Sequence, residues 1–278
     1  MLTSCMCTQG QLISPTFERW GRVLLPALGR VGLCDEKGRT HLHRKLWEWC
    51  YIAEALDERG MLWSGRKGLA FAVGQEPLAA AFASLGCRIL ATDLDPVRAD
   101  AKGWVATNQH ADSLASLNAA GLCDPDRFRE RVSFRFVDMN AIPDDLQESA
   151  FDFVWSSCSI EHLGSLELAE RFVTNAMHCL KPGGVSVHTT EYNLSSNDDT
   201  IAQGDTVLFR RRDIESLARR LRLNGHHMEI DFTPGGMPGD TDIDVPPYRS
   251  SPHLRLQFGA YVITSYGLIA RKGQAPPL

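Results

Sequence analysis

The stretch Gly68-Leu-Ala-Phe-Ala-Val-Gly-Gln-Glu-Pro-Leu78, followed by Thr92-Asp-Leu-Asp95, decides the fold of this 278-residue chain. It predicts a buried strand, a tight turn at Gly74, a helix that begins at Pro77, and a second strand that ends in acidic residues. In nucleotide-binding α/β units, the first strand-to-helix turn and an acid about 20 residues later hold a nucleoside. Asp93 has the position of that acid.

Glu76 stands two residues after the turn glycine, where a dinucleotide site needs a glycine so that the backbone can approach a pyrophosphate. A carboxylate there would repel a pyrophosphate, so the expected ligand is a nucleoside without phosphates, and a cation can accompany it. A second interpretation is that Glu76, just before Pro77, complements the N-terminus of the helix. The two roles are compatible, and the sequence leaves both open.

Strand and helix patterns alternate along the rest of the chain. Strands are expected at 68–73, 88–92, 132–137, 151–155, 185–190, 227–232 and 260–270, and helices at 41–60, 77–85, 96–121, 166–180 and 213–223. Alternation of this kind predicts an α/β fold with right-handed crossovers. We expect a doubly wound, mostly parallel, seven-stranded Rossmann-like sheet whose last strand is antiparallel, with an N-terminal helical cap.

The expected domain organisation has two parts. Residues 1–62 form an N-terminal arm and helical cap, and the first 30 residues have no clear period, which predicts a loose or partly disordered arm. Residues 63–278 form the main domain. Within it, residues 233–259 are rich in Pro, Gly and Asp, and a loop of that length is typically a lid or binding loop. We expect it to cover the substrate.

Composition narrows the function classes. The net charge of −5 and the pI near 6.0 disfavour a nucleic-acid partner, and no apolar run is long enough for a membrane span. The N-terminal residues do not resemble a signal peptide. Eight cysteines without a C-x-x-C pair predict neither a zinc site nor a disulfide framework, and favour reduced thiols in a cytoplasm. No metal site is predicted, although Asp240, Asp242 and Asp244 could be either a solvated acidic loop or oxygen ligands.

Five segments in order make the chain resemble a class I S-adenosylmethionine-dependent methyltransferase, of the type 11-like domain, over about residues 66–190. They are Ala72-Val-Gly74-Gln-Glu76, Ala91-Thr-Asp93-Leu94-Asp95-Pro96, Phe136-Val-Asp138-Met139-Asn140-Ala-Ile-Pro143, Phe151–His162 and Leu180-Lys-Pro-Gly-Gly184. The chain departs from the family pattern at two of the three glycines of the first motif, and at Ala70, where an acid is expected. The resemblance implies S-adenosyl-L-methionine as the cofactor.

The resemblance also implies cofactor-binding residues. They are Gly74, Glu76, Asp93 with Leu94 toward the ribose, Asp138 and Met139 toward the adenine, and Ser156 after the fourth strand. Three of them have a plainer alternative beside that of Glu76: Gly74 can simply make a tight turn, Asp138 is common in turns, and Ser156, like Ser157, can bond its own turn.

His162 and Glu191 are the expected catalytic residues, because both follow strands at the reactive edge of the sheet. Transfer to a hydroxyl requires removal of its proton, and a histidine suits that role. His162 could equally start a helix and bond Glu161 or the backbone. Glu191 could orient His162 or the substrate, or be a solvated loop acid.

Two further features have a functional and a plain interpretation. The run Arg210-Arg-Arg212 could meet an anionic substrate or form a solvated face. Trp47, Trp49 and Trp104 could line a substrate pocket or pack in the core.

The function expected from the sequence is S-adenosylmethionine-dependent O-methylation of a small molecule or a sugar or glycan substrate, by in-line transfer with a histidine base. N-methylation would need only an exposed lone pair. The alternatives are a non-catalytic cofactor-binding or assembly protein on the same fold, and a nicotinamide-dependent oxidoreductase, which the missing second glycine disfavours. The oligomeric state is not predicted.

Overall fold

A single mixed sheet organises the computed structural model, which describes residues 1–97, 114–148 and 150–274. In the described part the sheet has nine strands, in the order β4-β3-β2-β5-β6-β9-β8-β7, with β1 paired to β9. The parallel strands are β4 (Val132–Phe136), β3 (Arg88–Asp93), β2 (Lys67–Ala70), β5 (Phe151–Ser156) and β6 (Leu180–Asn193).

The antiparallel part begins at β9 (Tyr261–Arg271), which pairs with β6 over nine residues from Val185 to Asn193. The remaining strands are β8 (Arg255–Phe258), β7 (Ile243–Asp244) and β1 (Cys5–Met6). β8 and β1 both pair antiparallel with β9, and β7 pairs parallel with β8.

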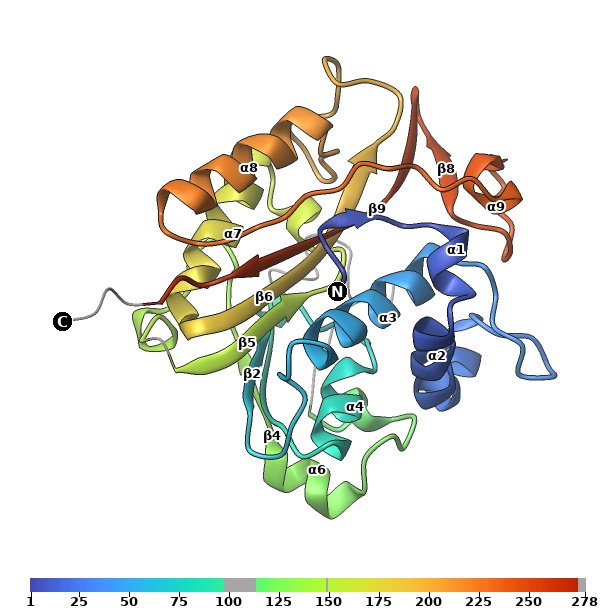
Figure 1. Cartoon of the computed structure of the whole chain (residues 1–278). Coiled ribbons are helices and arrows are strands. Elements are labelled where there is room, and N and C mark those ends of the chain that lie inside the picture. Colours follow the sequence, from blue (N-terminus) through green and yellow to red (C-terminus); the bar gives the residue numbers. More distant parts are fainter. Residues whose placement is uncertain (98–113, 149, 275–278) are drawn as a thin grey trace.

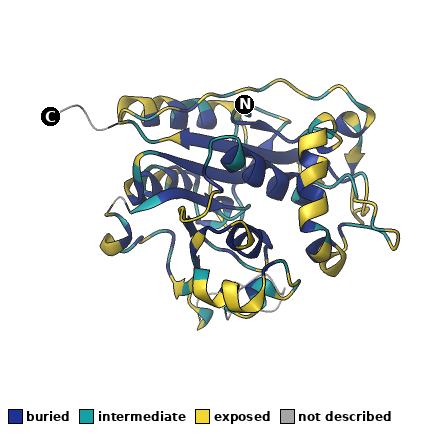
Figure 2. Ribbon diagram, turned by 60° about the horizontal axis from the view of Figure 1, so that its bottom comes forward, coloured by how far each residue is buried: buried dark blue, intermediate teal, exposed yellow. Residues whose placement is uncertain are grey.

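Alternation of side chains along the strands divides the core between the two faces of the sheet, because successive residues point to opposite sides. Ala70, Phe153 and Trp155 belong to the core on one face. Leu69 and Val154, their chain neighbours, belong to the core on the other face. Figure 2 shows the strands buried between helices whose outer surfaces are exposed.

Helices cover both faces (Figure 1). One face carries α2 (Pro15–Leu28), α3 (Arg44–Asp57), α4 (Leu78–Ser84) and α6 (Pro125–Arg131). The other face carries α7 (Leu166–Cys179) and α8 (Arg211–Leu223). Short helical turns complete the described part: α1 (Gln9–Leu12), η1 (Gly29–Val31), η2 (Ser116–Asn118), η3 (Asp144–Leu146), η4 (Ile160–His162) and α9 (Pro238–Thr241).

The predicted α/β class, the parallel sheet and its antiparallel last strand are confirmed, but the predicted number of seven strands is wrong. Residues 227–232 form no strand, and make only isolated bridges from His227 to Arg271 and from Ile230 to Ser4. The outer edge of β9 is already taken by β8 and β1, so this segment has no long edge with which to pair.

The expectation of a loose arm over the first 30 residues is also wrong. α2 begins after Ser14, whose hydroxyl caps the helix, and it buries Phe17, Trp20, Leu24 and Leu28. These four positions recur every three to four residues, which is the stripe of an amphipathic helix. Pro15 and Pro26 disguise that period, although Pro15 occupies the first turn, where proline is tolerated.

Most of the predicted helix over 96–121 lies outside the described residues. Of the described remainder, residues 96–97 are helical and η2 lies near the end of the range. Residues 233–259 are not one irregular loop, since they contain α9, β7 and β8. Among the helices of the described ranges, none has the length and apolar character needed to cross a bilayer.

Candidate functional site

A cavity of about 490 Å³ opens at the carboxyl ends of the parallel strands, between the sheet edge and the beginning of α3. This is where ligands bind in open α/β sheets, and the volume is in the usual range for small-molecule sites. The predicted residues that line it are Gly74, Glu76, Asp93, Leu94, Asp138, Met139, His162 and Glu191. Ser156 is the one predicted residue that does not line it.

The turn after β2 is fastened to the end of β3. Gly74 has a φ of +49°, a conformation that favours glycine, and its N–H donates to Asp93 Oδ2 over 2.9 Å. Asp93 Oδ1 accepts from the N–H of Leu94 over 2.8 Å. These two backbone donors use two of the roughly four lone-pair sites of a carboxylate. Asp93 is thereby fixed at the cavity wall.

Glu76 is a buried acid with one unmatched oxygen. Its Oε1 accepts from the indole N–H of Trp155 over 2.6 Å, whereas Oε2 has no hydrogen-bond partner among the described residues. Burial raises the pKa of Glu76 to about 8, with Asp93 and Glu48 adding to the rise and the Trp155 bond and Lys45 opposing it. Glu76 makes no capping hydrogen bond to α4, whose N-terminus has no side-chain cap.

The polar groups on this side of the cavity fit a nucleoside that carries a positive charge. Asp93 and Asp138 offer carboxylate oxygens, which accept from hydroxyl and amino groups and repel phosphate. Glu76, which is neutral without a ligand, ionises more readily beside a cationic group, and that group would satisfy its unmatched Oε2. The predicted cofactor has ribose hydroxyls, a sulfonium and an ammonium group, and no phosphate.

At the end of β4, Asp138 makes the turn that was its plainer alternative, since its Oδ1 accepts from the N–H of Asn140 over 2.8 Å. It lines the cavity as well, beside Met139, so the turn and a ligand contact are compatible. Asn140 donates to the carbonyl of Leu163 over 3.2 Å, while its own Oδ1 is buried without a partner among the described residues.

Ser156 points away from the cavity. Its hydroxyl lies 2.8 Å from Nδ1 of His188, whose Nε2 lies 2.7 Å from Ser186 Oγ. Burial lowers the pKa of His188 to about 3, so this histidine is a neutral core residue. Ser157, the first residue after β5, lines the cavity instead, and its hydroxyl is 3.4 Å from Glu48 Oε2.

Three charged residues at the beginning of α3 were missed by the sequence reasoning. Arg44 and Lys45 line the cavity, and Glu48 lies behind them, fully buried. Lys45 Nζ is 2.5 Å from Glu48 Oε2, and Arg44 Nη1 is 3.6 Å from Glu48 Oε1. Burial opposes ionisation of Glu48, but Lys45 and Arg44 outweigh it and lower its pKa to about 2. The sequence signal for them was Glu48 itself, an acid between Trp47 and Trp49, two residues that could pack in the core or line a pocket.

His162 belongs to η4, after β5. Its Nδ1 is 2.7 Å from the carbonyl oxygen of Asp205 and 3.4 Å from the hydroxyl of Thr206. A carbonyl only accepts, so in the neutral ring Nδ1 carries the proton and Nε2 carries the lone pair. The backbone bond considered as the plainer alternative for His162 is therefore present. It fixes the tautomer with the lone pair on Nε2, which a general base requires.

Glu191, near the end of β6, forms an ion pair with Arg44. The hypothesis that it is a solvated loop acid is wrong, because it is 6% exposed. Its second oxygen, Oε2, has no hydrogen-bond partner among the described residues. Arg44 bridges α3 to β6 at this point, and burial of that guanidinium is compensated by Glu191 and Glu48.

Glu161 and Cys158 also line the cavity and were not selected from the sequence. Glu161 is 1% exposed, and its Oε2 lies 3.3 Å from the hydroxyl of Thr190. Burial raises its pKa to about 7, with His162 opposing and Glu191 adding to the rise. Cys158 has a φ of +42°, and its N–H donates to the carbonyl and the hydroxyl of Thr189 over 3.1 and 3.0 Å.

Residues 233–259 contribute no side chain to the cavity wall. The three acids considered as oxygen ligands have protein partners: Asp240 accepts from the N–H of Gln9 and Met237, Asp242 pairs with Arg249, and Asp244 with Arg249 and His253. The expected substrate-covering role of this segment therefore finds no support. Side chains between residues 31 and 49 line the cavity instead, among them His43, Arg44, Lys45 and Trp49.

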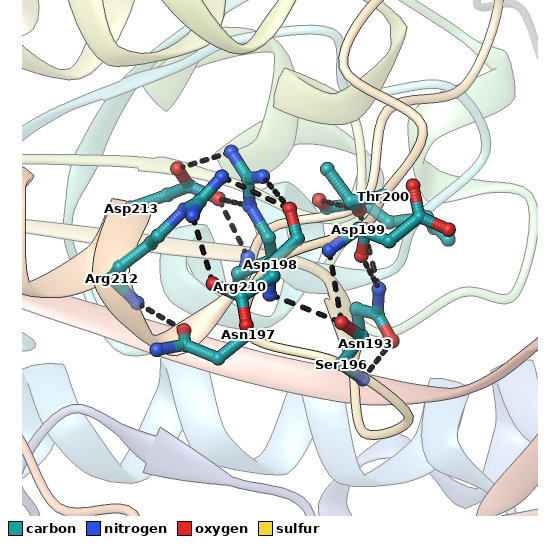
Figure 3. A network of polar contacts seen from close by, with 10 residues as sticks. Asn193, Ser196, Asn197, Asp198, Asp199, Thr200, Arg210, Arg212 and Asp213 are labelled. Atoms are coloured by element: carbon teal, nitrogen blue, oxygen red, sulfur yellow. Dashed lines mark hydrogen bonds and ion pairs between the residues drawn. The ribbon is translucent and has the colours of Figure 1, made fainter.

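The arginine run is engaged in local contacts at the start of α8, away from the cavity (Figure 3). Arg210 pairs with Asp213 and Arg212 with Asp198. Of the three tryptophans, Trp49 lines the cavity, Trp47 is fully buried, and Trp104 lies outside the described residues.

Comparison with known proteins identifies the central part of the chain. Residues 69–188 match a family model described as a methyltransferase domain. No curated protein sequence matches the chain. Both the turn after β2 and the η4 segment lie inside the matched residues.

Solved structures share the fold at low sequence identity. A structure from Galdieria sulphuraria, assigned provisionally as a sarcosine dimethylglycine methyltransferase, is 18% identical with a TM-score of 0.51, covering 81% of this chain and 84% of its own. The 1,6-didemethyltoxoflavin-N1-methyltransferase of Burkholderia thailandensis, solved with 1,6-didemethyltoxoflavin and S-adenosylhomocysteine, is 16% identical with a TM-score of 0.50, covering 94% of this chain and 92% of its own. At these identities the likeness shows the fold alone.

Proposed function

We propose that this chain, an S-adenosylmethionine-dependent methyltransferase whose methyltransferase domain spans residues 69–188, methylates a hydroxyl oxygen of a small molecule or a sugar. The methyltransferase assignment sets aside the two alternatives of a non-catalytic protein and a nicotinamide-dependent oxidoreductase. The acceptor atom and the residues that act on it are the subject of the proposal.

In the proposed arrangement the cofactor lies along the ends of β2, β3 and β4. Asp93 accepts from the ribose hydroxyls, with Leu94 beside it, and Asp138 and Met139 meet the adenine. Gly74 allows close approach of the backbone, and Glu76 faces the positively charged end. When bound, S-adenosylmethionine supplies an electrophilic methyl group on a sulfonium, which is a good leaving group.

The acceptor lies at the other side of the cavity, near His162 and Glu191. The observation that carries the proposal is the bond between His162 Nδ1 and the Asp205 carbonyl, because it leaves the lone pair on Nε2. His162 accepts the hydroxyl proton of the substrate as the oxygen attacks, a role typically worth 10²–10⁴-fold in rate. Glu191, fixed by Arg44, and Glu161 offer acceptor oxygens to further hydroxyl groups of the substrate.

The experiment is a methylation assay with a panel of small molecules in matched pairs that differ only in a hydroxyl or an amino group at the acceptor position. Products are identified by mass spectrometry, which locates the added methyl. We expect methyl on oxygen, and a kcat lowered about 10²–10⁴-fold in His162→Ala. The matched control is His227→Ala, whose side chain is exposed and does not line the cavity.

Two results would contradict the proposal. Methyl found only on nitrogen, with His162→Ala as active as the wild type, would make the chain an N-methyltransferase that needs no base. Equal losses in His162→Ala and His227→Ala would mean that the effect is one of stability, and thermal unfolding of both variants distinguishes that case.

A further inference from the structure

Three side chains able to bind a metal meet in the acceptor part of the cavity. They are the thiol of Cys158 and the carboxylates of Glu161 and Glu191, from the turn after β5, from η4 and from β6. One ligand atom of each lies within 4.8 Å of those of the other two. All three residues line the cavity, so a ligand held between them would face the substrate.

Two of these side chains are buried with an oxygen left unmatched. Glu161 is 1% exposed and Glu191 is 6% exposed. Among the described residues, Glu161 Oε1 and Glu191 Oε2 have no hydrogen-bond partner. A buried carboxylate oxygen without a partner costs free energy that a bound cation would recover. Both unmatched atoms belong to residues of the same cluster.

The two cations nearby are already paired. Lys45 lies 2.5 Å from Glu48, and Arg44 pairs with Glu191 and Glu48. With Glu161 and Glu191 ionised, these five side chains carry two positive and three negative charges. A Cys158 thiolate brings the net charge to −2, and a divalent cation brings it to zero.

We propose that Cys158, Glu161 and Glu191 bind a divalent transition-metal ion, of which Zn²⁺ is the representative. Sulfur is a poor ligand for Mg²⁺ and Ca²⁺, whereas Zn²⁺ binds cysteine and carboxylate together. Three protein ligands leave the fourth tetrahedral position open, as in catalytic zinc sites. Binding releases the Cys158 proton to solvent, because the thiolate is the ligand.

The open position faces the cavity, so it would take the hydroxyl oxygen of the substrate. A bound divalent ion lowers the pKa of an oxygen ligand and so assists removal of its proton. This consequence for catalysis rests on the proposed function. The metal site itself does not, since its binding is measured without donor or substrate.

The test uses the full chain, freed of metal with a chelator and titrated with Co²⁺ in place of Zn²⁺. A cobalt–thiolate bond gives a charge-transfer absorption in the near ultraviolet. We expect that band in the wild type and its loss in Cys158→Ser. The matched control is Cys34→Ser, which should keep the band, because Cys34 is the other half-buried cysteine of the described residues and lies outside the cavity wall.

A second variant tests the carboxylate arm. Glu161→Gln keeps the shape of the side chain and removes its charge, and we expect at least ~100-fold weaker Zn²⁺ binding by calorimetry, since even outer-shell partners are worth 10–100-fold. Circular dichroism of each variant shows whether it is folded. If a folded variant cannot be obtained, the wild-type cobalt spectrum with and without prior alkylation of Cys158 decides the same question.

The proposal is overturned if the wild type shows no cobalt–thiolate band, or if Cys158→Ser keeps it. It is also overturned if folded Glu161→Gln binds Zn²⁺ as tightly as the wild type does. These results are independent of the methylation assay. A metal-binding chain that methylates nitrogen would contradict the proposed function alone, and a metal-free chain that methylates oxygen would contradict the metal site alone.

Discussion

The two sides of the cavity are held in place by different kinds of interaction. The side proposed to hold the methyl donor, called the donor half, lies at the ends of β2, β3 and β4 and contains Gly74, Glu76, Asp93 and Asp138. Backbone bonds such as that from Gly74 to Asp93 fix most of it. The acceptor half, at the beginning of α3 and the ends of β5 and β6, consists of Arg44, Lys45, Glu48, Cys158, Glu161, His162 and Glu191. The ion pair of Arg44 with Glu191 joins α3 to β6, and Lys45 and Arg44 pair with Glu48 within α3.

The separation of contacting residues along the chain explains why the donor half was predictable from the sequence and the acceptor half was not. Gly74 and Asp93 are 19 residues apart, inside one strand–helix–strand unit. Arg44 and Glu191, which form an ion pair, are 147 residues apart. Glu48 accepts a hydrogen bond from the hydroxyl of Ser265, which is 217 residues away. Local geometry positions the donor half, whereas the acceptor half depends on the packing of α3 against the whole sheet.

The largest effect is expected for Glu48→Ala. The substitution leaves Lys45 and Arg44 short of a buried counter-charge, and breaking a buried pair in this way typically costs about 3–5 kcal/mol. Urea unfolding should show the loss. Glu36→Ala, at an exposed acid, is the matched control and should stay within about 0.5 kcal/mol of the wild type. Similar stability of both variants would mean that the acceptor half is not held by its ion pairs.

The next effect is a pH dependence of stability due to Glu76 in the absence of ligand. Its folded-state pKa of about 8 is above the ordinary value of 4.5, because burial favours the neutral acid. The stabilisation is therefore complete below pH 4.5 and is lost as the pH rises through 8, by roughly 3–5 kcal/mol at 1.36 kcal/mol per pKa unit. Lys45, Asp93 and Glu48 are the charged groups that face it.

The variant Glu76→Gln tests whether Glu76 causes this pH dependence of stability. The amide oxygen can still accept from Trp155, and the side chain no longer titrates. From pH 5 to pH 9, the free energy of unfolding should decrease by less in Glu76→Gln than in the wild type. Parallel pH profiles for the two proteins would contradict a buried neutral acid at this position.

Asp93→Ala should weaken binding of S-adenosylhomocysteine by about 100-fold, because hydrogen bonds to a charged group are worth about 1.5–3 kcal/mol each. Calorimetry measures the affinity. The matched control is Asp95→Ala, at an exposed acid two residues on that bonds only the N–H of Val97 among the described contacts. His162→Ala, in the acceptor half, should leave this affinity unchanged. A loss there as large as in Asp93→Ala would remove the distinction between the halves.

The smallest effect is expected for Arg212→Ala. Arg212 forms an exposed pair with Asp198 at the start of α8, and such pairs are worth about 0–1 kcal/mol. Stability and kcat/KM should both stay near the wild-type values. A marked rise in KM would reinstate the arginine run as part of the substrate site.

Within the donor half, some residues could be predicted from the sequence and others could not. Gly74, Asp93 and Asp138 could be placed at the cavity from the sequence, because a strand that ends in a turn or an acid has a local signature. Ser156 was chosen over Ser157 because the sequence does not fix where β5 stops alternating. Glu76 was seen as anomalous, but its bond to Trp155, 79 residues away, could not be foreseen.

The sequence by itself determined the α/β class, the parallel strands, the antiparallel last strand and the edge of the sheet at which the cavity opens, because hydrophobic periodicity and turn residues act over a few neighbours. Only the tertiary structure decided the extra strands around β9, the docking of residues 1–62 and the charged cluster from α3 to β6. These depend on which distant segments share an edge or a buried contact, and a buried charge such as Glu48 has no partner until the chain is folded.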